Sequence, residues 1–128
     1  MPPPQAFSIL VVDDDPDVVE TTVTLLDLHG YRAAGATGGG EALAAAAADP
    51  PAVALVDLGM PGVDGFQLAR RLKDLPAAPL LVAVTGRTSD ADRERAGRAG
   101  FAAYLVKPVP PAELLDLVRL CEQARSWD

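Results

Sequence analysis

Short apolar segments alternate along the chain with longer segments whose apolar residues recur at helical spacing. The apolar segments cover residues 7–12, 31–34, 53–56, 80–84 and 102–106, and the weakest pattern is that of residues 31–34. Most of them show no polar alternation, which is typical of strands buried on both faces. Such strands, separated by helices, predict an α/β fold: a doubly wound parallel sheet of five strands.

The first predicted helix has a clear start and a clear end. Asp15 is a suitable N-cap, and Pro16 fits the first helical position, where no backbone N–H is needed. Gly30 suits a left-handed residue at the C-terminal end. The apolar face of this helix is predicted to contain Val18, Val19, Val23, Leu25, Leu26 and Leu28.

Similar signals place the remaining helices, which are predicted at about residues 37–48, 64–74, 89–100 and 111–124. Asp64 followed by Gln67 resembles a capping box at the start of the third helix. Ser89 with Asp92 marks the start of the fourth, and Gly100 ends it.

The composition fits one domain without a membrane segment. The chain has 128 residues, 49% of them hydrophobic, which is enough for one core. Residues 1–6 are predicted to form a flexible tail, and residues 125–128 a second tail or a truncated linker. No apolar run is long enough to span a bilayer, and the N-terminal residues do not resemble a signal peptide, so a cytoplasmic location is expected.

The charge and the cysteine content restrict the partners and the compartment. The net charge is −7 and the pI is about 4.5, which argues against direct nucleic-acid binding because that requires a basic surface. The single cysteine, Cys121, cannot form an internal disulfide, in agreement with a reducing compartment.

Polar side chains follow directly on four of the predicted strands. They are Asp13 with Asp14, Asp57, Thr85 and Lys107. The carboxyl ends of parallel strands meet at one edge of the sheet, so these side chains are expected to share one crevice. Each close pair of carboxylates costs on the order of 4 kcal/mol at an effective dielectric constant of about 20. The crevice therefore needs positive charge.

Lys107 supplies one positive charge, and a hard divalent cation would supply the rest. Mg²⁺ suits a site with few protein oxygens, because it retains water and accepts phosphate oxygens as ligands; Mn²⁺ is the alternative. With these cations in place, Asp57 is predicted to attack phosphorus and form an aspartyl phosphate. Thr85 and a backbone N–H after Asp57 would donate hydrogen bonds to the transferred oxygens.

The ordered set of motifs resembles the receiver domains of response regulators in two-component phosphorelays, and in particular the chemotaxis-regulator type. The resemblance spans nearly the whole chain and is carried by residues 9–14, 56–61, 84–86 and 104–108. It implies the flavodoxin-like strand order 2-1-3-4-5. It also implies a phosphoprotein of signal transduction that catalyses only its own phosphorylation and dephosphorylation, and is not otherwise an enzyme.

The resemblance also assigns roles to individual residues. It implies Asp57 as the phosphoacceptor, and Asp13, Asp14, Asp57 and the backbone carbonyl of Gly59 as the magnesium ligands. Lys107 would pair with the phosphoryl group, and the bond to Pro108 would be cis.

A conformational switch is implied as well. Thr85 would move toward the phosphoryl group, and Tyr104 would turn inward, changing the surface of the fourth helix, fifth strand and fifth helix. Gly59, Gly86 and Arg87 would control access to the phosphoryl group.

The expected partners are a sensor histidine kinase or a histidine phosphotransfer domain, together with an unidentified output protein or domain. The chain would be a monomer or a phosphorylation-dependent dimer. Pro110 departs from the family pattern, because an N-cap residue such as Asp is expected before the fifth helix.

Two other functions are compatible with parts of the pattern. A haloacid-dehalogenase-type phosphohydrolase also uses Asp, Thr and Lys at strand ends, but Asp17 stands where that family has Thr or Val, and the chain has no room for a cap domain. A binding module with an intact but unused site would act through its fourth and fifth helices regardless of phosphorylation.

Overall fold

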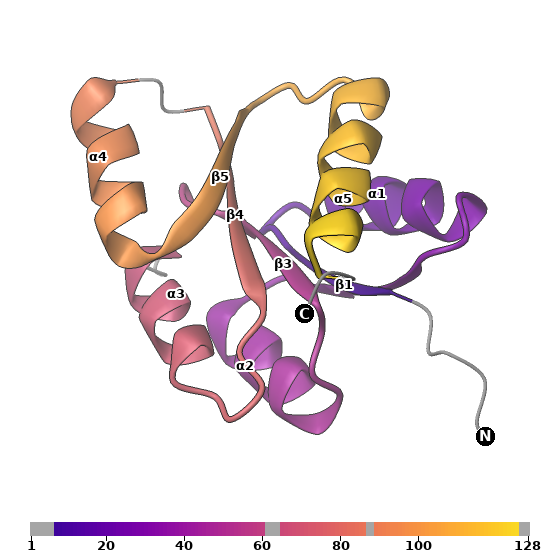
Figure 1. Ribbon diagram of the computed structural model, residues 1–128, viewed down its shortest axis with the longest axis horizontal. Coiled ribbons are helices and arrows are strands. Elements are labelled where there is room, and N and C mark those ends of the chain that lie inside the picture. The colour runs from indigo at the N-terminus through magenta and orange to yellow at the C-terminus, as the bar shows by residue number, and fades with distance from the viewer. Residues whose placement is uncertain (1–6, 61–64, 87–88, 126–128) are drawn as a thin grey trace.

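The strands and helices alternate five times along the chain. The computed structural model describes residues 7–60, 65–86 and 89–125 (Figure 1). The strands are β1 (Ser8–Val12), β2 (Arg32–Ala36), β3 (Val53–Asp57), β4 (Leu80–Thr85) and β5 (Phe101–Val106). The helices are α1 (Pro16–Leu28), α2 (Gly39–Ala48), α3 (Gly65–Lys73), α4 (Asp90–Ala99) and α5 (Pro111–Arg125).

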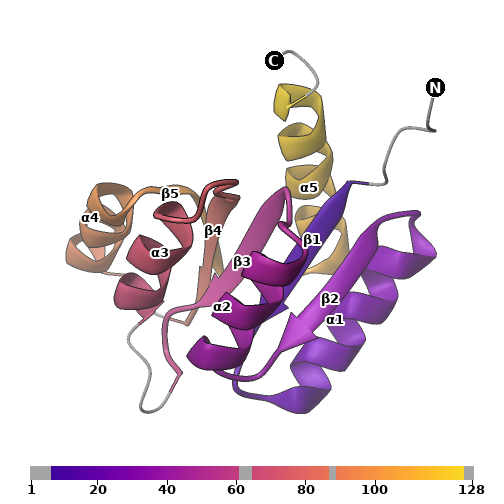
Figure 2. The same cartoon turned by 90° about the horizontal axis from the view of Figure 1, so that it is seen from below.

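All strand pairs are parallel, and their order is β2-β1-β3-β4-β5, which confirms the predicted topology. Figure 2 shows the strands side by side, with β2 and β5 at the two edges of the sheet. The central position of β1 and β3 explains their apolar composition, because both are covered on both faces.

Helices cover both faces of the sheet (Figure 1). On one face, Leu10 and Val12 pack in a core with residues from α2, α3 and α4. On the other face, Ile9 and Val11 pack in a second core with residues from α1 and α5. Successive residues of β1 thus enter different cores, as the period of two in a strand requires. The prediction of a doubly wound α/β fold is confirmed.

The predicted helix ends are confirmed where the structure describes them. The Asp15 carboxylate accepts a hydrogen bond from the backbone N–H of Asp17, and the Ser89 hydroxyl accepts one from Asp92. Gly30 and Gly100 have φ angles of 87° and 99°, a left-handed conformation that glycine adopts without a Cβ clash. Asp64, the predicted cap of α3, lies outside the described residues.

Two predictions about local structure need correction. Leu28 was expected on the apolar face of α1 but is 78% exposed, because it lies two residues, or about 200°, from the buried Leu26. Val18 is exposed as well. The second strand runs to Ala36 instead of residue 34, since its register with β1 pairs Ala36 with Val12.

The predicted tails fall mainly outside the described residues. Residues 1–6 and 126–128 are not described, and Arg125 is the last residue of α5. Within the part of the chain that the structure covers, no helix combines the length and the apolar character needed to cross a membrane.

Candidate functional site

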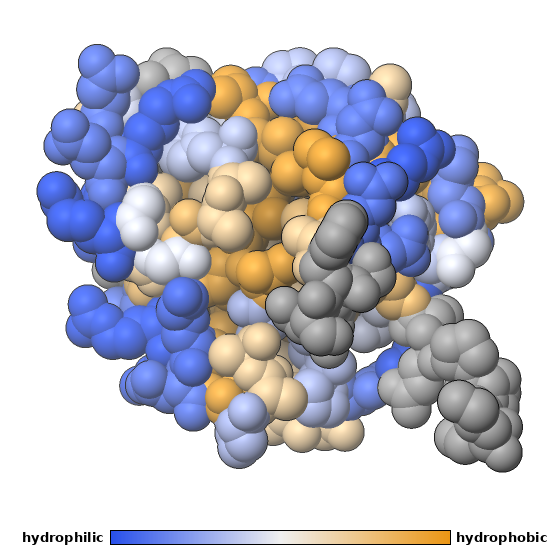
Figure 3. Space-filling model, in the orientation of Figure 1, coloured by the Kyte–Doolittle hydropathy of each residue, from blue (hydrophilic) through white to orange (hydrophobic). Residues whose placement is uncertain are grey.

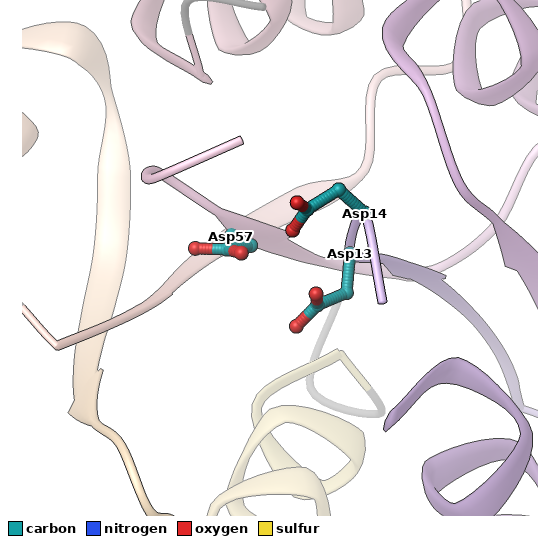
Figure 4. A group of neighbouring side chains, drawn as sticks. All are labelled: Asp13, Asp14 and Asp57. Atoms are coloured by element: carbon teal, nitrogen blue, oxygen red, sulfur yellow. The ribbon is translucent and has the colours of Figure 1, made fainter. Parts of the chain in front are cut away.

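Four strand ends bring the predicted site residues to one edge of the sheet. Asp13 directly follows β1, Asp57 ends β3, Thr85 ends β4, and Lys107 directly follows β5. Figure 4 shows the carboxylates of Asp13 and Asp14 beside that of Asp57. The exposed fractions of Asp13 and Asp57 are only 3% and 6%, so both acids are held in a largely dehydrated environment.

The buried carboxylates also shape the turns that follow their strands. Oδ1 of Asp13 accepts a hydrogen bond of 3.0 Å from the backbone N–H of Asp15. Oδ1 of Asp57 likewise accepts one of 2.9 Å from the backbone N–H of Gly59. Both are side-chain turns of the kind that Asp forms with the residue two positions later. Each carboxylate is thereby fixed in orientation and keeps its second oxygen for another partner.

That second oxygen is bound by Lys107 in both cases. Nζ of Lys107 lies 2.6 Å from Oδ2 of Asp13 and 3.2 Å from Oδ2 of Asp57. The backbone N–H of Lys107 donates a hydrogen bond of 2.9 Å to the carbonyl oxygen of Thr85, which places the lysine at the end of β4 as well. The Lys107–Pro108 peptide bond is cis.

The charges around Lys107 determine its protonation. Partial burial lowers the pKa of the ammonium, but the hydrogen bond that it donates to Asp13, the charges of Asp57 and Asp13, and the hydrogen bond that it donates to Asp57 raise the pKa. The net result is a pKa above the ordinary value for lysine. Lys107 is therefore a permanent cation at neutral pH and neutralises part of the acidic cluster.

Asp14 is the exposed member of the acidic cluster that it forms with Asp13 and Asp57. Desolvation by the surrounding protein, a hydrogen bond with Asp13 and the negative charges of Asp13 and Asp57 raise the pKa of Asp14, and a backbone hydrogen bond opposes them. The raised pKa disfavours the ionised form of Asp14, first through desolvation and then through the neighbouring acids.

The cluster fits a hard divalent cation. One oxygen from each of Asp13, Asp14 and Asp57 lies within 4.8 Å of the others. Two ligands on opposite sides of a Mg²⁺ ion are about 4.2 Å apart, so small side-chain movements would bring these oxygens to a shared ion. Carboxylate oxygens with room for water are also the donor set that Mg²⁺ prefers.

The outer side of the cluster is bordered by small residues. Gly59 is exposed, and a Cβ built on it would lie 3.5 Å from Oδ1 of Asp57. Among the described residues, a Cβ built on Gly86 would meet no atom within 4 Å. Neither glycine places a side chain beside Asp57. Arg87, the third residue predicted to control access, lies outside the described residues.

The two predicted switch residues occupy neighbouring strands. Thr85 is buried at the end of β4, where it pairs in the sheet with Val106. Tyr104 lies on β5, is half-buried, and packs against the core formed with α2, α3 and α4. The guanidinium carbon of Arg93 lies 4.8 Å from the centre of its ring. Tyr104 is therefore in contact with α4, the helix that the predicted switch would move.

One positioning residue was missed from the sequence. A Cβ built on Gly65, the first residue of α3, would lie 2.9 Å from Cα of Leu58 and 3.2 Å from the carbonyl oxygen of Asp57. The absence of a side chain at Gly65 thus lets α3 approach the backbone of the proposed nucleophile. In the sequence, Gly65 is one more glycine in a Pro/Gly-rich turn, and only its tertiary contact distinguishes it.

Comparison with known proteins identifies the family. The model of the response regulator receiver domain matches residues 9–119. Protein PilH of Pseudomonas aeruginosa is 36% identical over 113 residues, covering 86% of this chain and 93% of PilH. The transcriptional regulatory protein KdpE of Mycobacterium tuberculosis is 35% identical over 111 residues, covering 87% of this chain but only 49% of KdpE. The chain thus spans about half the length of such regulators.

Solved structures agree with the sequence comparison. A CheY-like receiver domain protein from Methanospirillum hungatei superposes with a TM-score of 0.89 at 29% identity, covering 97% of this chain and all of the other. The chemotaxis protein CheY4 of Vibrio cholerae has a TM-score of 0.84 at 27% identity, covering 91% of this chain and 99% of CheY4. Receiver domains are signalling phosphoacceptors that bind Mg²⁺ at an acidic pocket, and Asp13, Asp14 and Asp57 form such a group here. The chain belongs to the response regulator receiver domain family of two-component systems.

Proposed function

We propose that this protein takes a phosphoryl group onto Asp57 in a Mg²⁺-dependent reaction and changes its surface in response. The observation that carries the proposal is the position of Lys107, whose ammonium contacts both Asp13 and Asp57. A buried carboxylate is a poor acceptor for an anionic phosphoryl group unless cations surround it. Lys107 supplies one of these cations at the required place.

In the proposed reaction, a carboxylate oxygen of Asp57 attacks the phosphorus atom of a phosphohistidine. An O–P bond forms as the P–N bond breaks, and the electron pair of the P–N bond returns to the imidazole nitrogen. Asp57 becomes an acyl phosphate, and no redox change occurs. In this reaction Lys107 exchanges its contact with Oδ2 of Asp57 for a phosphoryl oxygen, which needs only a rotation of its flexible side chain.

The proposed metal ligands are Asp13, Asp14, Asp57 and the backbone carbonyl of Gly59. The ion would neutralise charge on the phosphoryl oxygens and orient the donor. Asp13 and Asp57 are supported by their burial and fixed orientation, and Asp14 by its carboxylate oxygen, which lies within 4.8 Å of theirs. Mn²⁺ is expected to substitute, since it accepts the same oxygen donors.

The proposed switch couples Asp57 to α4, β5 and α5. Thr85 would move its hydroxyl toward the phosphoryl group, and Tyr104 would rotate inward. The contact of Tyr104 with Arg93 supports this coupling, because a rotation of the ring would remove a contact that α4 now makes with β5. The two packings would differ in free energy by a few kcal/mol, so the phosphoryl group has to favour one of them only modestly.

The proposed phosphoryl donor is a sensor histidine kinase or a histidine phosphotransfer domain, and the receiver acts in the cytoplasm. Its catalysis would be limited to its own phosphorylation and dephosphorylation. The output would reside in another protein or domain, with no direct nucleic-acid binding by these residues, because the net charge is −7. The chain would be a monomer or would form a dimer when it is phosphorylated.

The decisive experiment is intact-mass measurement after incubation with Mg²⁺ and acetyl phosphate. The wild-type protein should gain the mass of one phosphoryl group, and Asp57→Asn should not. Asp116→Asn, which changes an exposed carboxylate on α5, is the matched control and should label like the wild type. The proposal fails if no phosphoprotein forms with acetyl phosphate or a panel of histidine kinases, or if Asp57→Asn labels normally.

Two further measurements separate the other functions. Steady turnover of small phosphate esters that is lost in Asp13→Asn would indicate a phosphohydrolase instead. Affinity for a partner that is unchanged by beryllofluoride, a phosphoryl mimic, would indicate a binding module that does not use its site.

A further inference from the structure

A basic cleft lies between α3 and α4, two helices that pack side by side in Figures 1 and 2. Its volume is about 400 Å³, and the described residues that line it are Phe66, Gln67, Arg70, Arg95, Arg98 and Ala99. Three guanidinium groups and no carboxylate thus occur among these described lining residues. Figure 3 shows the corresponding hydrophilic surface over α4.

The charge of α3 is opposite to that of the molecule, whereas α4 contains as many acidic as basic residues. The chain carries a net charge of −7, whereas α3 contains Arg70, Arg71 and Lys73 in its last turn and no acidic residue in its first. The residues of α3, Gly65–Lys73, include no Asp or Glu at all. A local excess of positive charge attracts anionic partners to that part of an acidic protein.

One of the guanidinium groups is held in place by the core. The guanidinium carbon of Arg95 lies 4.0 Å from the ring centre of Phe66. Phe66 is itself buried and packs edge-to-face against Phe101, with ring centres 6.4 Å apart. Stacking on a fixed ring restricts the side chain of Arg95 and keeps its positive charge at the cleft.

The other two guanidinium groups are available from opposite sides. Arg98 follows Arg95 by three residues, so the two lie about one turn apart along α4. The Arg98 contact with Glu94 is long, at 4.0 Å between two side chains that are each 74% exposed, and a pair of this kind contributes little. Arg70 reaches the same cleft from α3.

The positions of the three arginines in the cleft indicate the class of ligand. The guanidinium groups come from α3 and from two successive turns of α4, an arrangement that suits several carboxylates spaced along a chain. A long polyanion such as nucleic acid would also meet the negative field of the rest of the protein. A short acidic peptide contacts only the basic cleft.

We propose that the basic cleft between α3 and α4 is a docking site for an Asp/Glu-rich segment of a protein partner. The carboxylates of that segment would form paired hydrogen bonds with Arg70 and Arg98, Arg95 would add positive charge, and Gln67 would add a neutral donor. The site is separate from the residues proposed to react at Asp57. Asp57 is not among the residues that line the cleft, so Asp57→Asn removes none of them.

The test is fluorescence-polarisation binding of a short labelled peptide of alternating Asp and Gly, with an Asn–Gly peptide as the uncharged control. The full chain should bind the acidic peptide at an ionic strength of about 0.01 M and more weakly at about 0.15 M, because salt screens the ion pairs. Arg70→Glu and Arg98→Glu should each weaken binding by about tenfold or more. Arg71→Glu is the matched control: it makes the same charge change on the same helix outside the cleft lining and should change affinity less than about twofold.

Amide chemical shifts of the wild-type protein provide a readout that needs no variant. Addition of the acidic peptide should shift the amides of α3 and α4, including those of Gly97 and Gly100. The proposal is overturned if the peptide does not bind at low salt, if Arg71→Glu weakens binding as much as Arg70→Glu, or if the shifts lie elsewhere. Tighter binding of a single-stranded oligonucleotide with the same arginine dependence would assign the cleft to nucleic acid instead. Asp57→Asn removes the proposed phosphoacceptor. If this variant still binds the peptide, the docking site is supported whether or not Asp57 is phosphorylated in the wild-type protein.

Discussion

The ammonium of Lys107 lies 2.6 Å from Oδ2 of Asp13, a residue 94 positions earlier in the chain. The same nitrogen lies 3.2 Å from Oδ2 of Asp57. The ends of β1, β3 and β5 are thereby joined through one cation, although their residues are far apart in sequence. The stability of this edge and its proposed chemistry both depend on that shared contact.

Replacing Lys107 should therefore affect stability and phosphorylation together. Lys107→Met removes the cation between two buried carboxylates and should lower the free energy of unfolding by about 1–2 kcal/mol in EDTA, a value reduced for the partial exposure of the lysine. Phosphorylation by acetyl phosphate should slow on the order of 100-fold. Urea denaturation and intact-mass kinetics measure the two effects. Lys73→Met, at an exposed lysine of α3, is the control and should change neither.

Replacing Asp14 should stabilise the metal-free protein. The folded-state pKa of Asp14 is raised, so the folded protein binds this proton more tightly than the unfolded chain does. Its contribution to stability consequently falls as pH rises from the ordinary Asp value of about 3.9, and the penalty is complete above the higher folded pKa. Asp14→Asn should raise the melting temperature in EDTA at neutral pH, with a difference that shrinks in acid. A lower melting temperature for the variant in EDTA at neutral pH would contradict the assignment.

Mg²⁺ should stabilise the protein in a pH-dependent manner. At a concentration about tenfold above Kd, binding adds about 1.4 kcal/mol to the free energy of unfolding, which corresponds to about 4–6 °C in melting temperature for a chain of this size. Protons compete with the metal for the carboxylates. Because the pKa of Asp14 is raised, the thermal shift should begin to decline at a higher pH than an ordinary Asp would give. Differential scanning fluorimetry with and without Mg²⁺ across pH checks this, and Asp14→Asn should remove most of the shift.

Adding one methyl group at Gly65 should disturb the proposed nucleophile. The Cβ of Gly65→Ala would lie 2.9 Å from the backbone of Leu58, so either α3 or the turn after Asp57 has to move. We expect a loss of about 1–3 kcal/mol in the free energy of unfolding and slower phosphorylation at Asp57. Gly97→Ala is the control on α4: apart from the backbone of its own helix, no atom of the described residues would lie within 4 Å of its Cβ, and alanine favours a helix interior. Equal behaviour of the two variants would show that the contact at Gly65 has no effect.

Local signals were enough to place most elements. The caps at Asp15 and Ser89 and the left-handed end at Gly100 depend only on residues a few positions apart, and all were predicted correctly. Errors arose where a neighbour in space decided. β2 extends to Ala36 because β1 offers a pairing partner there, and Leu28 is exposed because no element packs on its side of α1 among the described residues.

The sequence by itself determined the alternation of strands and helices and the presence of an acid, a threonine or a lysine at four strand ends, because both follow from local hydrophobic pattern and residue type. Only the tertiary structure decided that one ammonium contacts both Asp13 and Asp57, that Gly65 approaches Leu58, and that Arg70 joins Arg95 and Arg98 in one cleft. The physical reason is that these contacts join segments distant in the chain, whose separation depends on sheet order, register and the packing of helices on the sheet. No local preference of the residues themselves encodes those distances.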